Sequence, residues 1–486
     1  MLKVWFTAAE AAPFAKTGGL GDVAGSLPQA LKKLGIDARI CLPAYQGIPK
    51  ELLAHKKKVV RKEVPLAWRK QRLTVWETDL NGVPAYLLDQ PYYFDRPAYY
   101  GYFDDAERFA FFSRAALDIL PDIGFQPDII HAHDWHTALT PLYLRGMYAQ
   151  QDFWRAMSTV LTIHNLAYQG RFSPEVAEDV FGLAWDYHSG SLEYYESVNC
   201  LKGGILAADY VTTVSPTYAK EICTSEGGDG LDGELRSRGE RLLGIVNGID
   251  TDNYNPWRDE ALTHRFHRGL LPRRKENKHA LQAELGLEIS DAPLVVMVSR
   301  LVAAKGLDLI CDVMEDFFAQ GCQFALLGSG EAHYEAFFRY AQKRWPGRFA
   351  ARIGFDDALA RRLYGGGDLL LMPSLYEPCG ISQLIAMRYG CLPLVRETGG
   401  LRDTVRSYNR YSGEGTGFSF SEPYRDSFNG ALAEAIALYQ DKDAWDAVVK
   451  QAMGADFGWA ASAKLYRDLY QTARREKNGA GNEGEH

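Results

Sequence analysis

Residues 294–306, Leu-Val-Val-Met-Val-Ser-Arg-Leu-Val-Ala-Ala-Lys-Gly, carry the clearest indication of the fold. Its first five residues, 294–298, are all apolar, as is typical of a strand that is buried on both faces of a parallel sheet. The loop that follows carries two cations and leads into a helix-like segment that begins near Lys305. A buried strand, a loop and a helix in this order predict one unit of a doubly wound α/β domain.

The same pattern recurs along the chain. Helix-like segments separate short apolar runs, which predicts right-handed βαβ crossovers and parallel sheets. In the first half the predicted strands are 4–7, 38–42, 85–88, 128–130, 159–163, 210–214 and 242–246, and in the second half they are 294–298, 323–327, 349–353, 369–372 and 392–395.

The chain has 486 residues, more than one hydrophobic core usually holds, which predicts two or three domains. The polar segment 247–289 interrupts the alternation and contains Pro256 and Pro272, so it is predicted to be a hinge or linker. We expect domains at 1–247 and 248–456, with ligands beyond the carboxyl ends of their strands. The Gly- and Glu-rich tail, 477–486, is predicted to be disordered.

Composition excludes several classes of function. Hydrophobic residues make up 47% and charged residues 24%, and no window approaches the roughly 20 apolar residues of a membrane helix. The start does not resemble a signal peptide, so we expect a cytoplasmic protein. The net charge of −8 and the absence of a basic run argue against nucleic acid as a partner. Seven scattered cysteines without a C-x-x-C favour free thiols over disulfides or zinc.

A glycine-rich segment, 16–23, follows the first predicted strand and opens a helix. Gly18 and Gly19 allow close approach of a ligand to the backbone, and helix-start amides favour an anion, beside which Lys16 adds a positive charge. The helix is predicted to begin near Asp22. A dinucleotide fingerprint also fits formally, but the glycines lie too far beyond the strand.

Histidines follow two more predicted strands. The segment 131–136 holds three histidines and Asp134, and a metal site is one interpretation, although no carboxylate or cysteine constellation elsewhere completes it. A polar loop at the end of the strand is the other interpretation, and we expect that one. His164 and Asn165 directly follow the strand 159–163, where they could bind hydroxyl groups or simply form a satisfied loop.

Two cations follow the strand 294–298. Arg300 and Lys305 lie five positions apart beside a helix start, an arrangement that suits a diphosphate. A leaving diphosphate gains negative charge, so cations placed there stabilise the transition state more than the ground state. The alternative is a solvated pair, which the helix dipole would oppose.

A carboxylate follows the strand 369–372. Glu377 lies in the segment Pro-Ser-Leu-Tyr-Glu-Pro-Cys-Gly-Ile-Ser, 373–382, beside Pro378, where the backbone is restricted. A carboxylate in a cleft can accept hydrogen bonds from two sugar hydroxyls at once. The alternative is a glutamate that the dipole at a helix start favours.

Together these segments resemble the glycogen synthase and starch synthase family. The resemblance rests on Lys-Thr-Gly-Gly-Leu at 16–20, His-Asn-Leu-Ala-Tyr-Gln-Gly at 164–170 and Glu-Pro-Cys-Gly at 377–380, and it extends over residues 2–472. It implies an α/β protein of the GT-B fold, with two Rossmann-like doubly wound domains, an interdomain catalytic cleft and a C-terminal helix, 457–476, that crosses back to the first domain. It also implies transfer of glucose, with retention, from ADP-glucose to the non-reducing end of an α-1,4-glucan, without a metal or other cofactor.

The resemblance also implies roles for individual residues. Arg300 and Lys305 match the diphosphate clamp, Glu377 the glutamate that engages the donor glucose, and His164 the histidine near the anomeric carbon. Further substrate contacts are implied for Lys16, Gly18, Gly19, Asp22, Asp134, Asn165, Phe355 near the base, Cys379, Gly380 and Ser382. Many related enzymes carry a second glutamate where this chain has Ile385, so Ser382 or backbone groups are expected to hold the ribose.

Other functions remain open at this stage. UDP-glucose could replace ADP-glucose, and the chain could be another GT-B glycosyltransferase. A phosphorylase of this shape would need a lysine-bound pyridoxal cofactor, and a nucleotide-sugar epimerase is a further alternative. A catalytically silent glucan-binding protein would not need the diphosphate clamp, and an oxidoreductase is disfavoured by the glycine spacing.

Overall fold

The computed structural model describes residues 1–482 and divides them into two units. The first unit comprises residues 1–248 together with 459–482, and the second comprises residues 249–458. The predicted first domain, 1–247, ends one residue before this boundary.

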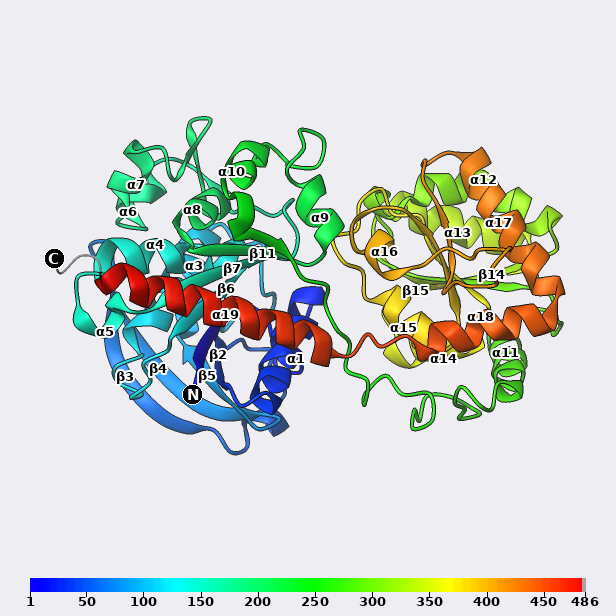
Figure 1. Ribbon diagram of the computed structural model, residues 1–486, viewed down its shortest axis with the longest axis horizontal. Coiled ribbons are helices and arrows are strands. Elements are labelled where there is room, and N and C mark those ends of the chain that lie inside the picture. Colours follow the sequence, from blue (N-terminus) through cyan, green and yellow to red (C-terminus); the bar gives the residue numbers. More distant parts are fainter. Residues whose placement is uncertain (483–486) are drawn as a thin grey trace. The chain divides into compact units, whose positions relative to one another are not determined.

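A nine-stranded sheet forms the centre of the first unit (Figure 1). Its order is β12-β11-β7-β6-β1-β2-β5-β4-β3, in which the strands from β12 to β5 pair in parallel and the hairpin of β3 and β4 adds an antiparallel edge. The bounds are β1 Lys3–Thr7, β2 Asp37–Pro43, β3 Lys57–Leu66, β4 Arg69–Leu80, β5 Val83–Asp89, β6 Ile129–His133, β7 Ser158–Ile163, β11 Tyr210–Thr213 and β12 Leu242–Gly244. A small antiparallel sheet contains β8 Arg171–Phe172, β9 Glu193–Tyr194 and β10 Ser197–Asn199.

Helices cover the sheet of the first unit, and the last of them comes from the far end of the chain (Figure 1). They are α1 Gly19–Lys33, α2 Pro91–Phe94, α3 Asp105–Asp118, α4 Leu139–Tyr143, α5 Asp152–Arg155, α6 Val176–Asp179, α7 Ala184–His188, α8 Cys200–Ala207, α9 Pro216–Glu221, α10 Asp232–Ser237 and α19 Trp459–Asn482. Helix α19 packs against α1 and β7. The Ser158 hydroxyl donates to the Ala473 carbonyl at 3.0 Å, and the Tyr210 hydroxyl donates to Glu476 at 2.8 Å.

The predicted disordered tail is wrong for residues 477–482, because α19 continues to Asn482. This segment, Lys-Asn-Gly-Ala-Gly-Asn, is rich in poor helix formers, so its helical state follows from extension of a helix that is already nucleated by packing and not from propensity. The rest of the predicted tail, 483–486, lies outside the described residues.

A six-stranded parallel sheet forms the centre of the second unit. Its order, β15-β14-β13-β16-β17-β18, is the Rossmann order 3-2-1-4-5-6 when the strands are counted within the unit. The strands are β13 Leu294–Val298, β14 Gln323–Gly328, β15 Phe349–Ile353, β16 Leu369–Met372, β17 Leu392–Arg396 and β18 Phe418–Phe420. The helices are α11 Pro272–Leu285, α12 Leu307–Ala319, α13 Ala332–Arg344, α14 Asp357–Gly366, α15 Ser382–Arg388, α16 Gly399–Thr404, α17 Arg425–Gln440 and α18 Lys442–Gly454.

The segment predicted as a linker is mostly part of the second unit. Leu262 and Phe266 are buried in the core of that unit, and α11 occupies 272–285. Inside α11, the buried Lys278 ammonium donates to Asp368 at 2.6 Å and to the Tyr439 hydroxyl at 2.8 Å. The sequence conceals this core role because the helix is rich in charged residues, two of which, Arg274 and Lys278, are nevertheless buried.

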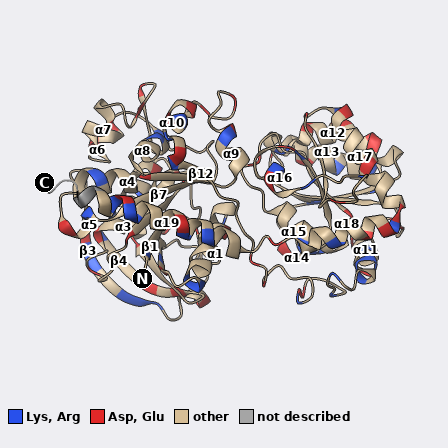
Figure 2. Cartoon of the chain, in the orientation of Figure 1, with Lys and Arg blue, Asp and Glu red and all other residues tan. Residues whose placement is uncertain are grey.

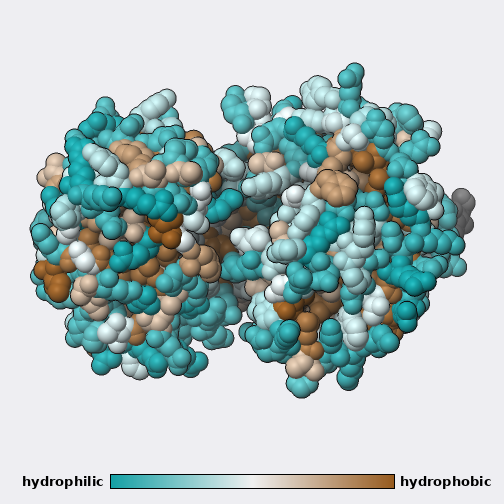
Figure 3. Space-filling view, turned by 180° about the vertical axis from the view of Figure 1, so that it is seen from behind, coloured by the Kyte–Doolittle hydropathy of each residue, from teal (hydrophilic) through white to brown (hydrophobic). Residues whose placement is uncertain are grey.

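The surface is polar and of mixed charge. Figure 2 shows acidic and basic residues dispersed over both units, consistent with the modest net charge of −8. The face drawn in Figure 3 is mainly hydrophilic, with small, separate hydrophobic patches. Among the described residues, no helix is both long enough and apolar enough to span a bilayer.

Candidate active site

In the second unit, the predicted donor residues follow two adjacent strands. Strands β13 and β16 pair in parallel, and the strand order reverses between them. Ligands of doubly wound sheets bind beyond the carboxyl ends of the strands at such a switch point. Arg300 and Lys305 lie in the loop after β13, and Glu377 lies in the loop after β16.

Close backbone packing holds these two loops together. Gly306 has φ +71°, and a Cβ atom there would lie 2.1 Å from the Pro373 carbonyl oxygen, so only glycine fits. The Leu375 amide donates to the Ala304 carbonyl at 2.9 Å. The loop after β13 is therefore fixed against the loop after β16, one residue from Lys305.

This packing brings a lysine and a glutamate into contact. Lys305 Nζ lies 2.5 Å from Glu377 Oε2, and the Ser374 hydroxyl donates to the same oxygen at 2.9 Å. The Glu377 side chain is only 9% exposed. Its other oxygen, Oε1, makes no hydrogen bond among the described residues. The pair leaves one carboxylate oxygen of Glu377 for an external donor such as a sugar hydroxyl.

Backbone contacts brace the turn that carries Glu377. The Gly400 amide donates to the Glu377 carbonyl at 3.1 Å. The Gln383 side-chain amide donates to the carbonyls of Cys379 and Gly380, each at 3.0 Å, and Gly380 takes φ +72°. Cys379 and Gly380 are thus part of a rigid turn beside Glu377, and the Cys379 side chain is buried.

The remaining predicted donor contacts differ in exposure. The Arg300 side chain is exposed and makes no hydrogen bond or ion pair with the residues that the structure describes. The Phe355 ring, after β15, is 91% exposed. Ser382 is half-buried at the start of α15. Arg300 and Phe355 are thus accessible to a ligand, whereas Ser382 is partly covered by the protein.

In the first unit, a buried glutamate holds the glycine-rich loop. Glu10, 3% exposed, accepts hydrogen bonds from the Thr17 amide and the Thr17 hydroxyl, both at 2.5 Å, and from the Tyr100 hydroxyl at 2.7 Å. Gly18 is the N-cap of α1, which begins at Gly19 and not near Asp22. Sequence reasoning missed Glu10, although an acid within the apolar run Ala-Ala-Glu-Ala-Ala, 8–12, is the signal that could have found it.

Lys16 and Asp22 pair with each other on this loop. Lys16 Nζ lies 2.7 Å from Asp22 Oδ1, with side-chain exposures of 41% and 29%. Asp22 also stands in the first turn of α1, where the helix dipole favours an acid. The lysine charge is therefore balanced here by Asp22, and an anion would have to compete for it.

Asp134 links the ends of β6 and β7. It takes φ +56° and accepts a hydrogen bond from the His164 amide at 2.7 Å. Burial raises the pKa of Asp134 to about 7, and nearby Glu10 adds to the rise, although the backbone amides of His164 and Asn165 oppose it. A carboxyl group with this pKa can hold or release a proton near neutral pH.

Three histidines lie in contact at the ends of β6 and β7; His131 and His133 are buried and His164 is half-buried. His133 Nδ1 lies 3.0 Å from His164 Nε2, and His131 bonds Thr162 at 2.6 Å and the Tyr470 hydroxyl at 2.7 Å. The prediction of a polar loop over 131–136 is wrong for His131 and His133, which lie in β6 and are fully buried. Burial lowers the pKa of His164 to about 3 and those of His131 and His133 well below their usual value, so these rings pack as neutral groups.

Asn165 shapes the loop after His164. Its side-chain oxygen accepts a hydrogen bond from the Ala167 amide at 3.0 Å. The amide of Leu166, between these two residues, donates to the Tyr218 hydroxyl at 3.1 Å. At the end of this loop Gly170 has φ +63°, and a Cβ atom would lie 2.4 Å from the Trp135 ring. Elsewhere in the first unit, the buried Oδ1 of Asn247 has no hydrogen-bond partner among the described residues.

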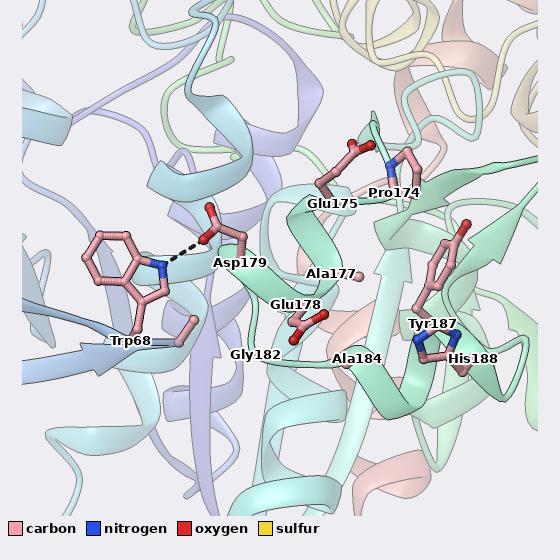
Figure 4. A pocket seen from close by; sticks show the side chains of 11 residues that line it. Trp68, Pro174, Glu175, Ala177, Glu178, Asp179, Gly182, Ala184, Tyr187 and His188 are labelled. Carbon is pink, nitrogen blue, oxygen red and sulfur yellow. Dashed lines mark hydrogen bonds between the residues drawn. The ribbon is translucent and has the colours of Figure 1, made fainter.

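No metal site is found among residues 1–482, where no group of three or more His, Cys, Asp or Glu side chains is placed to hold an ion. A cavity of about 660 Å³ lies elsewhere in the first unit, between α6, α7 and the turn after β3 (Figure 4). The Trp68 indole at its edge donates to Asp179 at 2.7 Å. None of the predicted site residues lines this cavity, so it is separate from the candidate active site.

Two family models match the chain. Residues 3–237 match "Starch synthase catalytic domain", and residues 284–451 match "Glycosyl transferases group 1". The chain is 47% identical to the glycogen synthase of Geobacillus thermodenitrificans (strain NG80-2), over 97% of each chain. It is also 47% identical to the glycogen synthase of Desulforamulus reducens, over 97% of this chain and 98% of the other.

Solved structures agree with the sequence relatives. The catalytic domain of Starch Synthase IV from Arabidopsis thaliana, bound to ADP and acarbose, matches with a TM-score of 0.91 and 36% identity, over 98% of this chain and 99% of that one. Sucrose-phosphate synthase from Thermosynechococcus elongatus shares the fold, with a TM-score of 0.61 and 17% identity. The prediction of a two-domain GT-B fold is confirmed. The chain belongs to the glycogen synthase and starch synthase family of glycosyltransferases.

Proposed function

We propose that this chain is a retaining glucosyltransferase that moves glucose from ADP-glucose to the non-reducing end of an α-1,4-glucan. The observation that carries the proposal is the braced pair of Lys305 and Glu377 at the switch point of the second unit, with one oxygen of Glu377 left for an external donor. Membership of the family supports the choice of reaction, and the names of the relatives support a glucan as acceptor.

Each donor residue has a role in this proposal. The guanidinium of Arg300 and the ammonium of Lys305 would bind the diphosphate and balance the charge that it gains on leaving. Oε1 of Glu377 would accept a hydrogen bond from the donor glucose and orient it. The exposed ring of Phe355 would stack on the base, and the turn at Cys379 and Gly380 would keep Glu377 in place.

The residues of the first unit would complete substrate binding. The loop with Lys16, Gly18, Gly19 and Asp22, held by Glu10, would contact phosphate and sugar. His164, Asn165 and Asp134 would contact sugar hydroxyls at the ends of β6 and β7. Ser382, at the start of α15, would contribute on the ribose side.

The proposed chemistry is a displacement on one face of the sugar through an oxocarbenium-like state. The bond from the anomeric carbon to the diphosphate oxygen breaks, and the bond to the acceptor oxygen forms on the same face. The acceptor hydroxyl gives its proton to the leaving phosphate, so ADP departs and the configuration is retained. In this proposal Glu377 forms no covalent bond to the sugar, because Lys305 and Ser374 hold its Oε2 and its Oε1 orients the donor glucose through a hydrogen bond.

The donor base, the cofactor requirement and the compartment are parts of the same proposal. We propose ADP-glucose over UDP-glucose, no metal or other cofactor, and a cytoplasmic location, where the free thiols of all seven cysteines would persist.

The test is nucleotide release from ADP-glucose and from UDP-glucose, each with and without glycogen and each with and without EDTA. Release of ADP that depends on glycogen and tolerates EDTA is the expected result, and β-amylase should liberate the newly added glucose from the product as maltose. Release of UDP faster than release of ADP would overturn the choice of donor. Loss of nucleotide release in EDTA would overturn the proposal that no metal is needed. If neither donor gives nucleotide release and the protein still binds glycogen, the proposed transferase is wrong and the chain is a glucan-binding protein.

A further inference from the structure

We propose that His133 is a positioning residue that fixes the tautomer of His164, so that His164 presents an N–H group at Nδ1 to bound substrate. The proposal rests on the function proposed above, because it assumes that His164 contacts the sugar or phosphate. Its first part, the tautomer of His164, concerns the chain alone.

The two rings are joined by one hydrogen bond. His133 Nδ1 and His164 Nε2 are 3.0 Å apart, the ring centroids are 5.3 Å apart and the ring planes are inclined by 27°. A hydrogen bond between two ring nitrogens needs a proton on one and a lone pair on the other. Burial lowers the pKa of both histidines below the neutral range, so each ring carries a single proton. Which ring donates therefore decides both tautomers together.

The surroundings of His133 select the donor. Its other nitrogen, Nε2, is buried without any hydrogen-bond partner among the described residues. If His164 donated, His133 would carry its proton on Nε2, as an orphaned buried N–H group. Orphaned N–H groups are rarer in proteins than orphaned acceptors, because a buried donor without a partner bears the full cost of its desolvation. His133 therefore donates through Nδ1 and keeps only a lone pair at Nε2.

The tautomer of His164 then follows. Its Nε2 accepts the bond from His133, so its proton is on Nδ1. That nitrogen makes no hydrogen bond with the described residues, and it is not among the buried atoms that lack one, so it is accessible. A neutral N–H at this position can donate to a hydroxyl or phosphate oxygen without adding charge. In the other tautomer the same position would offer a lone pair and lose that contact.

Other contacts hold the His133 ring in place without determining which of its nitrogens is protonated. His131 lies against it, with ring centroids 4.2 Å apart, and Phe6 stacks on its ring at 5.7 Å. His131 is itself held at both nitrogens, by Thr162 and by Tyr470 of α19. Removing the Tyr470 hydroxyl would therefore disturb a buried hydrogen bond of the same network and leave the bond between His133 and His164 intact.

The experiment uses three variants of the full chain. In His133→Asn the side-chain amide nitrogen takes the place of Nδ1 and can still donate, whereas His133→Ala removes the donor. Tyr470→Phe is the matched control. The readouts are the protonation of each ring nitrogen of His164, by nitrogen NMR of histidine-labelled protein assigned with His164→Gln, and the kcat and KM for ADP-glucose with glycogen.

The wild-type spectrum is expected to show His164 protonated at Nδ1 and unprotonated at Nε2. His133→Ala should lose that pattern and lower kcat roughly 10-fold or more, as removal of partners that orient a histidine does elsewhere. His133→Asn should keep the protonation pattern of His164 and most of the wild-type kcat. Tyr470→Phe should lower Tm but leave the His164 spectrum and kcat unchanged.

Two results would overturn the proposal. One is wild-type His164 protonated at Nε2, a result that needs no active variant and no correctly folded mutant. The other is His133→Ala with an unchanged His164 spectrum and unchanged kcat. Failure of the proposed function would look different: the wild-type spectrum would show Nδ1 protonated, while neither nucleotide sugar would yield nucleotide with glycogen.

Discussion

The ammonium of Lys305 and the carboxylate of Glu377 are hydrogen-bonded across 2.5 Å in the second unit, although 72 positions separate them in the chain. Glycine at 306 makes this possible, because any side chain there would collide with the Pro373 carbonyl. Arg300, on the same loop as Lys305, has no such partner among the described residues. The two cations should therefore respond differently to substitution, even though both are proposed to bind the diphosphate.

Arg300→Ala should lower kcat by roughly 100-fold or more, the usual cost of removing a group that stabilises transition-state charge. Its Tm should stay at the wild-type value, because the exposed guanidinium makes no hydrogen bond or ion pair in the described part of the chain. Acceptor-dependent ADP release and thermal unfolding measure the two effects. Arg410→Ala, at an exposed arginine whose guanidinium hydrogen-bonds Tyr411 and no other residue among 1–482, is the control and should keep wild-type kcat. Near-normal turnover in Arg300→Ala would show that Arg300 does not stabilise the leaving diphosphate.

Lys305→Ala should lower kcat by a similar factor and should also destabilise the fold. Glu377 would keep only the Ser374 hydroxyl as a partner in a largely buried position, at a cost of about 1–3 kcal/mol. The double variant Lys305→Ala with Glu377→Gln removes the uncompensated charge, so it should regain part of the stability without regaining activity. Urea unfolding of the two single variants and the double variant forms the required cycle. Strictly additive losses of stability would contradict the coupling.

The core strands could be predicted from the sequence because they are continuous apolar runs. The run 294–298 coincides with β13, and 349–353 with β15. The hairpin of β3 and β4 escaped prediction, because its strands mix lysine, arginine and glutamate with valine and leucine. Such a pattern is expected of antiparallel strands with one solvated face, and it lacks the long apolar runs of the core.

The site was predictable as a set of residues but not as a set of contacts. Strand-end position was enough to single out Arg300, Lys305 and Glu377, since all parallel strands present their carboxyl ends to the same edge. It could not reveal that Lys305 pairs with Glu377, which depends on packing between two loops. Glu10 was missed for the same reason, because its partners Thr17 and Tyr100 are brought to it only by folding.

Glu10→Gln should loosen the glycine-rich loop. The glutamine amide can offer one oxygen, whereas the carboxylate now accepts from the Thr17 amide, the Thr17 hydroxyl and the Tyr100 hydroxyl. Loss of charge-assisted bonds of this kind costs about 1.5–3 kcal/mol, and the KM for ADP-glucose should rise several-fold because Lys16 and Gly18 lose their anchor. Tyr100→Phe removes one bond alone and should give a smaller effect on both quantities. Unchanged KM and Tm in Glu10→Gln would show that the loop does not depend on this residue.

Asp134→Asn should change how stability depends on pH. The folded pKa of Asp134 is raised to about 7 by burial, whereas an unfolded aspartate titrates near 3.9, so the folded state binds the proton more tightly. The contribution of Asp134 to the free energy of unfolding is therefore fully present below about pH 3.9 and is lost as the pH rises through about 7, with a slope approaching about 1.4 kcal/mol per pH unit in between. Asparagine does not titrate, and its side-chain oxygen can still accept from the His164 amide.

Only the difference between the two proteins isolates this effect. The buried histidines act in the opposite direction, since a folded pKa of about 3 for His164 adds stability as the pH rises toward 6.5. Because both proteins share those histidines, their contribution cancels when the free energies of unfolding are subtracted. The measurement is urea unfolding at intervals from pH 4.5 to pH 8. The free energy of unfolding of Asp134→Asn, relative to that of the wild type, should increase up to about pH 7 and stay constant above it. A difference that stays constant across this range would mean that Asp134 is ionised in the folded protein throughout, and that its bonds to the backbone amides outweigh its burial.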